Sequence, residues 1–145
     1  MQCKRCEREL ETVTGPRIIR LRGGRQAEVE ATVRRCPECG EVFWRPADAE
    51  AAHKAASDQI RREEGLLLTE EIQEIRKGFG LTQKDFEQLL GVGPKTVARW
   101  EAGVVFQSKA ADALMRLLRV APENAEALAE WHGVQLPARS GHRVA

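Results

Sequence analysis

Net charge is almost absent from this 145-residue chain, because 23 Lys and Arg residues are balanced by 22 Asp and Glu residues. A histone-like protein or a polybasic tail binds nucleic acid through its net positive charge. A chain with balanced charges does not bind nucleic acid in this way. Any contact with nucleic acid must therefore come from basic side chains gathered at one place on the surface.

Long apolar runs and aromatic residues are scarce as well. Aromatic side chains make up 5% of the sequence, although its 42% of hydrophobic residues is enough to bury a core. No apolar run approaches the roughly 18 to 20 residues of a membrane span, and residues 1–6 lack the apolar segment of a secretory signal. We therefore expect a cytoplasmic protein with no membrane partner, in which cysteines are better explained as metal ligands than as disulfides.

A β-hairpin is predicted within residues 1–46, which also hold all four cysteines. Apolar and polar side chains alternate across residues 27–34, which is the period of a half-buried strand. Residues 22–25, with two adjacent glycines, supply a turn back to the apolar run at residues 18–21. We therefore expect residues 1–46 to form a small domain built on this hairpin.

Helical patterns fill the chain after residue 46. Residues 47–65 are rich in alanine, and their apolar stripe is too thin for a core of its own, so this segment is interpreted as a helical connector that Gly65 can end. Residues 66–132 contain five helical patterns, of which the first four are separated by breaks that contain glycine and the last begins at Pro122. Residues 133–145 bury little and are predicted to form a flexible tail.

The cysteines form two C-x-x-C pairs, Cys3 with Cys6 and Cys36 with Cys39. Each short loop can present two thiolates to one side of a tetrahedral metal centre, and the hairpin brings the second loop back to the first. The spacing predicts a zinc ribbon with one structural zinc, because so small a domain can hardly close a core without a metal. With the five helices that follow, the ribbon gives an α+β fold.

Two other uses of the cysteines stay open. An iron tetrathiolate, as in a rubredoxin-like electron carrier, would use the same ligands. A dithiol oxidoreductase would use one pair alone, although no strand–helix–strand pattern surrounds either pair. The three histidines, His53, His132 and His142, are interpreted as solvated side chains.

A helix-turn-helix is predicted after the middle of the chain. Thr82 can cap the first helix, and Asp85 approximates a capping box with it. Gly91 allows a tight turn, after which Gly93 takes the cap position and Pro94 the first helical position of the second helix. The two helices are therefore expected to cross at a sharp angle.

The second helix is predicted to carry a basic outer face. Helical geometry turns Val97 and Trp100 inward, which leaves Lys95, Thr96 and Arg99 on the opposite side near the start of the helix. Two cations four residues apart repel each other unless an anion lies opposite. Duplex DNA supplies that anion, and Arg is well suited to read guanine in the major groove.

The start of the preceding helix completes this predicted surface, because Gln83 and Lys84 would lie where a backbone phosphate meets free amides and the positive end of the helix dipole. A helical bundle whose charges are merely solvated stays open as an alternative. The predicted DNA-binding residues are Gln83, Lys84, Gly93, Lys95, Thr96 and Arg99.

Residues 81–103, LTQKDFEQLLGVGPKTVARWEAG, resemble the lambda-repressor-like, or XRE, family of helix-turn-helix domains. Together with the C-x-x-C loops, the layout of residues 1–132 resembles the MqsA antitoxin family, whose first half carries a YgiT-type zinc finger. The resemblance implies an antitoxin of a type II toxin–antitoxin system. Its ribbon would bind and neutralise a ribonuclease-type toxin, and its helix-turn-helix half would dimerise on palindromic operator DNA and repress the operon.

The resemblance also assigns residues. It implies that the zinc ligands are the four cysteines and that the base-reading positions are Lys95 and Arg99. A family member has Asn where this chain has Lys95, so a different operator sequence is expected, since Asn reads adenine and Lys prefers guanine. An arginine-rich ribbon loop also departs from the family and bears on which toxin is bound; it contains Arg17, Arg20, Arg22 and Arg25.

A homodimer is predicted through the C-terminal domain, because the last helices are more apolar than one small bundle needs, with half-sites about one DNA turn apart. The residues expected at this interface are Leu114, Leu117, Leu118, Leu128 and Trp131. A zinc-ribbon transcriptional regulator without a toxin partner is the main alternative. No enzyme is expected, because no nucleophile lies in an activating motif and no glycine-rich phosphate loop is present.

Overall fold

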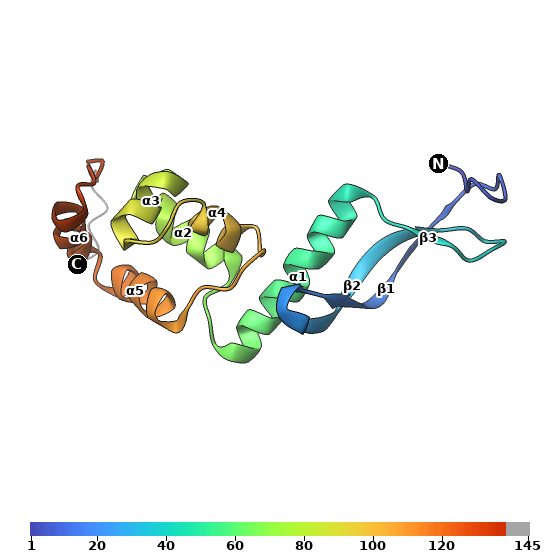
Figure 1. Ribbon diagram of the computed structural model, residues 1–145, viewed down its shortest axis with the longest axis horizontal. Helices are drawn as coiled ribbons and strands as arrows, with labels where there is room; N and C mark the ends of the chain where they lie inside the picture. The colour runs from blue at the N-terminus through green and yellow to red at the C-terminus, as the bar shows by residue number, and fades with distance from the viewer. Residues whose placement is uncertain (139–145) are drawn as a thin grey trace. The chain divides into compact units, whose positions relative to one another are not determined.

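The computed structural model describes residues 1–138, and the chain divides into two compact units, Met1–Ile60 and a second one from Arg61 onward. The first unit contains a small sheet and the larger part of one long helix, whereas the second is helical (Figure 1). This arrangement confirms the α+β fold. No helix among the described residues is both long enough and apolar enough to cross a bilayer.

The sheet of the first unit is antiparallel and has the strand order β1-β2-β3. Strands β1 (Glu11–Arg20) and β2 (Gln26–Arg35) form the predicted hairpin, joined by the short 3-10 turn η1 (Arg22–Gly24), and β3 (Val42–Phe43) pairs with the end of β2.

Strand β1 is longer than the apolar run at residues 18–21 indicated, because it continues back through Pro16 to Glu11. Proline lacks an N–H donor and is tolerated in a strand that lies at the edge of its sheet. Apolar and polar side chains do not alternate regularly in this part of the strand, so the sequence did not indicate it.

The core of the first unit is thin. On one face of the sheet Ala31 and Val33 are buried, and the opposite face exposes Thr14 and Ile18. Helix α1 (Pro46–Glu64) corresponds to the predicted connector. The buried residues of its apolar stripe are two alanines and one isoleucine, Ala52, Ala56 and Ile60. Gly65 follows the helix at a φ of 70°, as expected for a residue that ends it.

The second unit contains five complete α-helices within residues 61–138, as predicted. They are α2 (Thr69–Gly78), α3 (Gln83–Leu90), α4 (Thr96–Glu101), α5 (Lys109–Val120) and α6 (Ala125–His132), with the short 3-10 turn η2 (Pro122–Asn124) before the last. Their shared core contains large apolar side chains without measurable exposure, namely Leu67, Ile72, Phe86, Leu89, Val97, Met115 and Leu118.

A hydrogen-bonded polar cluster joins this core. The fully buried Arg61 guanidinium donates to the Gln107 side chain at 3.1 Å and to the Val105 carbonyl at 2.7 Å. Gln107 in turn donates to the Leu67 carbonyl at 2.8 Å, and the Leu67 N–H donates to the Asp112 carboxylate at 2.8 Å. Burial of these polar groups is tolerable because each one is hydrogen-bonded.

The helical unit continues past residue 132, where the tail was predicted to begin. Gly133 ends α6 at a φ of 67°, and the Val134 N–H donates to the Ala129 carbonyl at 2.9 Å. Val134 and Leu136 pack against the core, because the turn at Gly133 returns the chain to it. Residues 133–138 are thus part of the packed unit, and the rest of the predicted tail, residues 139–145, lies outside the described residues.

Candidate metal centre and nucleic-acid interface

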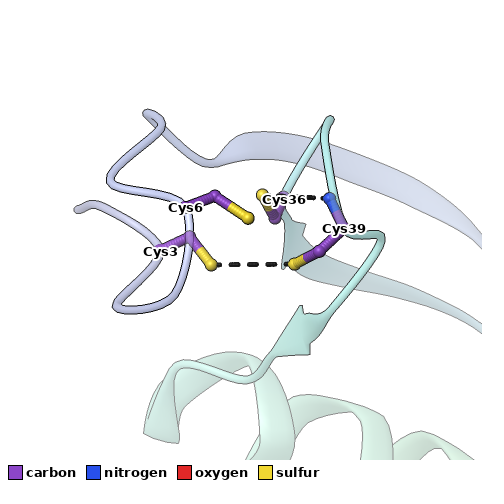
Figure 2. Close-up of side chains that lie close together, drawn as sticks. All are labelled: Cys3, Cys6, Cys36 and Cys39. Atoms are coloured by element: carbon purple, nitrogen blue, oxygen red, sulfur yellow. Dashed lines mark hydrogen bonds between the residues drawn. The ribbon is translucent and has the colours of Figure 1, made fainter.

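The four cysteines converge at the end of the hairpin opposite its turn. Cys3 and Cys6 lie on the N-terminal loop, Cys36 and Cys39 lie on the loop after β2, and their side chains point toward one another (Figure 2). All four sulfur atoms lie within 4.8 Å of one another, with 3.7 Å between the sulfurs of Cys3 and Cys39. Zinc–sulfur bonds of about 2.3 Å place tetrahedral sulfurs roughly 3.8 Å apart, so this cluster can hold one metal ion.

Both cysteine loops have the same backbone turn. The Glu7 N–H donates to the Cys3 carbonyl at 2.8 Å, and the Gly40 N–H donates to the Cys36 carbonyl at 2.9 Å. Each of these donors has a positive φ, 57° at Glu7 and 75° at Gly40. Glycine at position 40 adopts this conformation at little cost, whereas the first loop adopts it with a glutamate, at a cost of about 1 kcal/mol or more.

The thiol groups differ in their readiness to ionise. The backbone N–H of Cys39, 3.5 Å from the Cys36 sulfur, helps to lower the pKa of Cys36 to about 7. Burial raises the pKa of Cys6 to about 12, and hydrogen bonds with Cys39 and Cys36 add to the effect. Without a metal the cluster therefore keeps protons that a cation must displace, so its metal affinity rises with pH.

The first helix of the predicted helix-turn-helix is confirmed, with Thr82 as its cap. The Thr82 hydroxyl oxygen accepts the Asp85 N–H at 3.1 Å, and α3 ends at Gly91 with a φ of 76°. A side chain at Gly91 would also meet an obstacle, because its Cβ would lie 3.1 Å from Cε1 of His132. Glycine is thus favoured at this turn for two reasons, its positive φ and the close approach of the His132 ring.

The second helix begins later than predicted. Helix α4 starts at Thr96 with Lys95 as its N-cap, so the placement of Gly93 at the cap and Pro94 in the helix is wrong. The Thr96 N–H donates to the Gly93 carbonyl at 3.3 Å, and Lys95 has a φ of 64°. A proline followed by a residue of positive φ is the pattern of a type II turn. Residues 93–96 form this turn, so the helix begins only at its last residue.

The inner and outer faces of α4 are as the sequence indicated. Val97 and Trp100 are buried, whereas Lys95 and Arg99 are exposed and Thr96 is half-buried. The two cations thus lie at the surface above an apolar anchor.

The two flanking positions at the start of α3 differ from each other. Lys84 is exposed, but the Gln83 amide donates to the Glu101 carboxylate at 3.0 Å. The Glu101 carboxylate also accepts two hydrogen bonds from the Arg76 guanidinium, at 2.7 Å and 3.0 Å, in an ion pair that is almost entirely buried. The Gln83 side chain is therefore engaged within the domain.

Sequence reasoning missed three buried acidic side chains of this domain, Glu87, Glu101 and Asp112. Glu87 lies among Phe86, Leu89 and Leu90 on the inner side of α3. A carboxylate inside an apolar helix face is a signal of a specific partner, although the sequence does not say which partner.

The residues predicted for dimerisation fall into two groups. Leu117 and Trp131 are 50% and 71% exposed, whereas Leu118 is completely buried and cannot contact a second chain. Leu118 lies on the same side of α5 as Met115, three residues earlier, and both belong to the core. Val120, which is 76% exposed, adds an apolar side chain that was not predicted, and Leu114 and Leu128 are partly buried against the core.

The interpretation of His132 as a solvated side chain is also wrong. Its Nδ1 lies 2.7 Å from the Leu89 carbonyl, because the end of α6 packs against the end of α3. His53 is half-buried on α1, and His142 lies outside the described residues.

Comparisons with known proteins indicate the family of the chain. Residues 1–131 match the family described as the antitoxin component of a bacterial toxin–antitoxin system, MqsA. Over 60 residues the chain is 42% identical to YiaG of Escherichia coli K12, named as an uncharacterized HTH-type transcriptional regulator, and to its counterparts in E. coli O6:H1 and O157:H7. The matched segment is 41% of this chain and 62% of the relatives, so the chain spans less than two thirds of their length.

Proposed function

The chain belongs to the MqsA antitoxin family, and from this premise we propose that it neutralises a ribonuclease-type toxin and binds palindromic operator DNA to repress its own operon. The observation that carries the DNA-binding half is the exposed pair Lys95 and Arg99 above the buried Val97 and Trp100. Helix α4 would enter the major groove, with Arg99 reading a base edge. We propose no enzymatic role for the chain.

The DNA-binding face is proposed to include the six residues expected from the sequence, with unequal roles. Lys84 would contact a phosphate, since it is exposed at the start of α3. Gln83 would contribute mainly its backbone N–H, because its side chain is held by Glu101. The other four residues lie just before or on α4, where base contacts are usual in this class of domain; they are Gly93, Lys95, Thr96 and Arg99.

A symmetric dimer is proposed to present two such helices to the operator. Leu117, Val120 and Trp131 are exposed apolar side chains on α5 and α6, and they support an interface between two copies. Leu114 and Leu128 would line its edge. Two-fold symmetry then predicts half-sites about 34 to 36 Å apart.

We propose zinc as the metal and all four cysteines as its ligands. Four thiolates fill a tetrahedral site, which suits a structural ion that holds the two loops together. Metal analysis separates this from the rubredoxin-like alternative, since an iron tetrathiolate is coloured and a zinc tetrathiolate is not. A red protein that contains iron would overturn the assignment.

The DNA-binding proposal is tested with the substitution Arg99→Ala. It should cost about 1 to 3 kcal/mol of operator affinity and relax discrimination at one base pair, with metal content unchanged. Fluorescence anisotropy with the chain's own promoter fragment measures the affinity, and Arg62→Ala, which removes an exposed cation from α1, is the charge-matched control. Unchanged binding by the Arg99 variant would show that α4 is not the recognition helix.

The antitoxin proposal is tested by co-expression with the product of the neighbouring reading frame. A small toxic protein should be rendered harmless by the native chain and by Arg99→Ala, but not by Cys36→Ser, because we assign toxin binding to the N-terminal unit. The alternative of a regulator without a toxin is favoured by the similarity to YiaG. The absence of any toxic neighbour would select that alternative.

A further inference from the structure

Helix α4 begins without a cap of its own. Its N-cap residue, Lys95, has a left-handed backbone and makes no side-chain hydrogen bond to the helix. The first N–H groups of a helix lack partners within the helix, and a Ser, Thr, Asp or Asn side chain at the N-cap normally accepts one of them. Since Val97 is completely buried, its N–H cannot rely on water.

The missing acceptor comes from α3. Oε2 of Glu87 accepts the Val97 N–H at 2.9 Å, and Glu87 is only 6% exposed. Within residues 1–138 no Lys or Arg forms an ion pair with Glu87, whereas the other buried glutamate, Glu101, is paired with Arg76. The charge of Glu87 is therefore offset by the N–H groups and the positive dipole end at the start of α4.

A helix of six residues has little intrinsic stability, because isolated helices shorter than about 12 residues are marginal in water. The orientation of α4 thus depends on contacts with the rest of the domain. Val97 and Trp100 fix its buried side, and the Glu87 hydrogen bond fixes its first turn, next to Lys95.

We propose that Glu87 is the positioning residue of the recognition helix, whose carboxylate acts as a cap supplied from the neighbouring helix and holds Lys95 and Arg99 in the geometry that reads the operator. This inference rests on the proposed function of α4 in DNA binding. The role of Glu87 is that of a hydrogen-bond acceptor. Its negative charge opposes DNA, so a neutral acceptor should serve as well.

The test compares Glu87→Gln, which retains an acceptor oxygen, with Glu87→Ala, which removes it. Affinities for the chain's own promoter fragment and for a random duplex of equal length are measured at several salt concentrations. Glu87→Ala should lower the ratio of specific to non-specific affinity about tenfold, and Glu87→Gln should keep that ratio within about threefold of the native value. The salt dependence should stay the same, since no phosphate contact is lost.

A charge-matched control is Asp85→Asn, which removes a negative charge from the same helix away from Val97. This variant should raise both affinities alike and leave their ratio unchanged. Equal losses of the ratio in Glu87→Gln and Glu87→Ala would overturn the proposal, and so would an unchanged ratio in Glu87→Ala.

A second measurement needs no DNA. Hydrogen exchange at the Val97 amide should accelerate in Glu87→Ala relative to the amides of α5, and it should remain slow in Glu87→Gln. Slow exchange in both variants would overturn the capping role even if the protein binds its operator. A native protein that protects Val97 but shows no preference for its promoter would instead contradict the proposed function.

Discussion

The two units of the chain bury very different side chains. In the first unit the fully buried residues include Val33 and two thiols of the cysteine cluster, Cys3 and Cys36, whereas the second buries residues as large as Phe86 and Met115. Burial of apolar surface stabilises a fold by roughly 25 cal/mol per Å², and the first unit has little such surface to bury. The comparison indicates that a bound metal ion stabilises the first unit, whereas apolar packing stabilises the second.

Metal removal gives the largest expected difference between the units. A chelator, or the substitution Cys36→Ser, should unfold residues 1–45 and leave the helical unit folded, because structural zinc contributes apparent binding energies of about 10 to 16 kcal/mol in zinc-finger peptides. Residue-specific NMR spectra with and without metal check this. The control Thr14→Ser lies exposed on the same sheet and should change nothing. Native signals from a metal-free ribbon would contradict the comparison.

The reverse perturbation is the substitution Phe86→Ala. It should destabilise the helical unit by about 3 to 5 kcal/mol, because Phe86 is completely buried and leaves a cavity. Urea unfolding followed by circular dichroism measures the loss, and the metal content should not change. Lys77→Ala, an exposed position on α2, is the control, with an expected effect within about 0.5 kcal/mol. A parallel loss of the metal would show that the units do not fold independently.

The two units should unfold at different pH values when the solution is acidified. Burial tends to raise the pKa of Asp112, but hydrogen bonds from Leu67, Arg116 and Gln107 outweigh it and hold that pKa below its ordinary value of 3.8. A lowered pKa stabilises the fold above the ordinary value, and this contribution is lost as pH falls through the folded-state value.

The cysteine cluster responds at higher pH, because its ligands must be deprotonated to bind a metal. Mild acid should therefore release the metal and unfold the ribbon while the helical unit stays folded. Metal release and helical circular dichroism, followed in one titration, check the order. Simultaneous loss of both signals above pH 4 would contradict it, and Asp112→Asn should flatten the acid dependence of the helical unit.

The smallest predicted effect concerns strain in the second unit. Lys95→Gly should relieve the positive φ at Lys95 and stabilise the helical unit by up to about 1 kcal/mol, while it weakens operator binding. Changes of opposite sign in thermal stability and in DNA affinity are the expected signature. A destabilised variant would show that the Lys95 side chain has a structural role.

Local chemistry determined the features that the sequence predicted correctly. The spacing within each cysteine pair places two thiols on one short loop, Thr82 caps α3, and Gly91 ends it. Each of these depends on residues a few positions apart, where chain geometry leaves few choices.

The missed features depend on partners distant in sequence. The start of α4 was misplaced because Lys95 adopts a φ that side-chain-bearing residues rarely adopt. Leu118 was assigned to a dimer interface because its hydrophobicity does not reveal which side of α5 meets the core. The partners of Gln83 and Glu87 lie 18 and 10 residues further along the chain, and no local pattern indicates them.

Pro16 lies within β1, which is an edge strand of the three-stranded sheet and has no further strand paired with it among residues 1–138. An exposed strand edge is a template on which a second chain can add its own strand, and such growth leads to aggregates. The proline ring interrupts the row of N–H donors along this edge. The small sheet can therefore remain open on one side without adding strands from other copies of the chain.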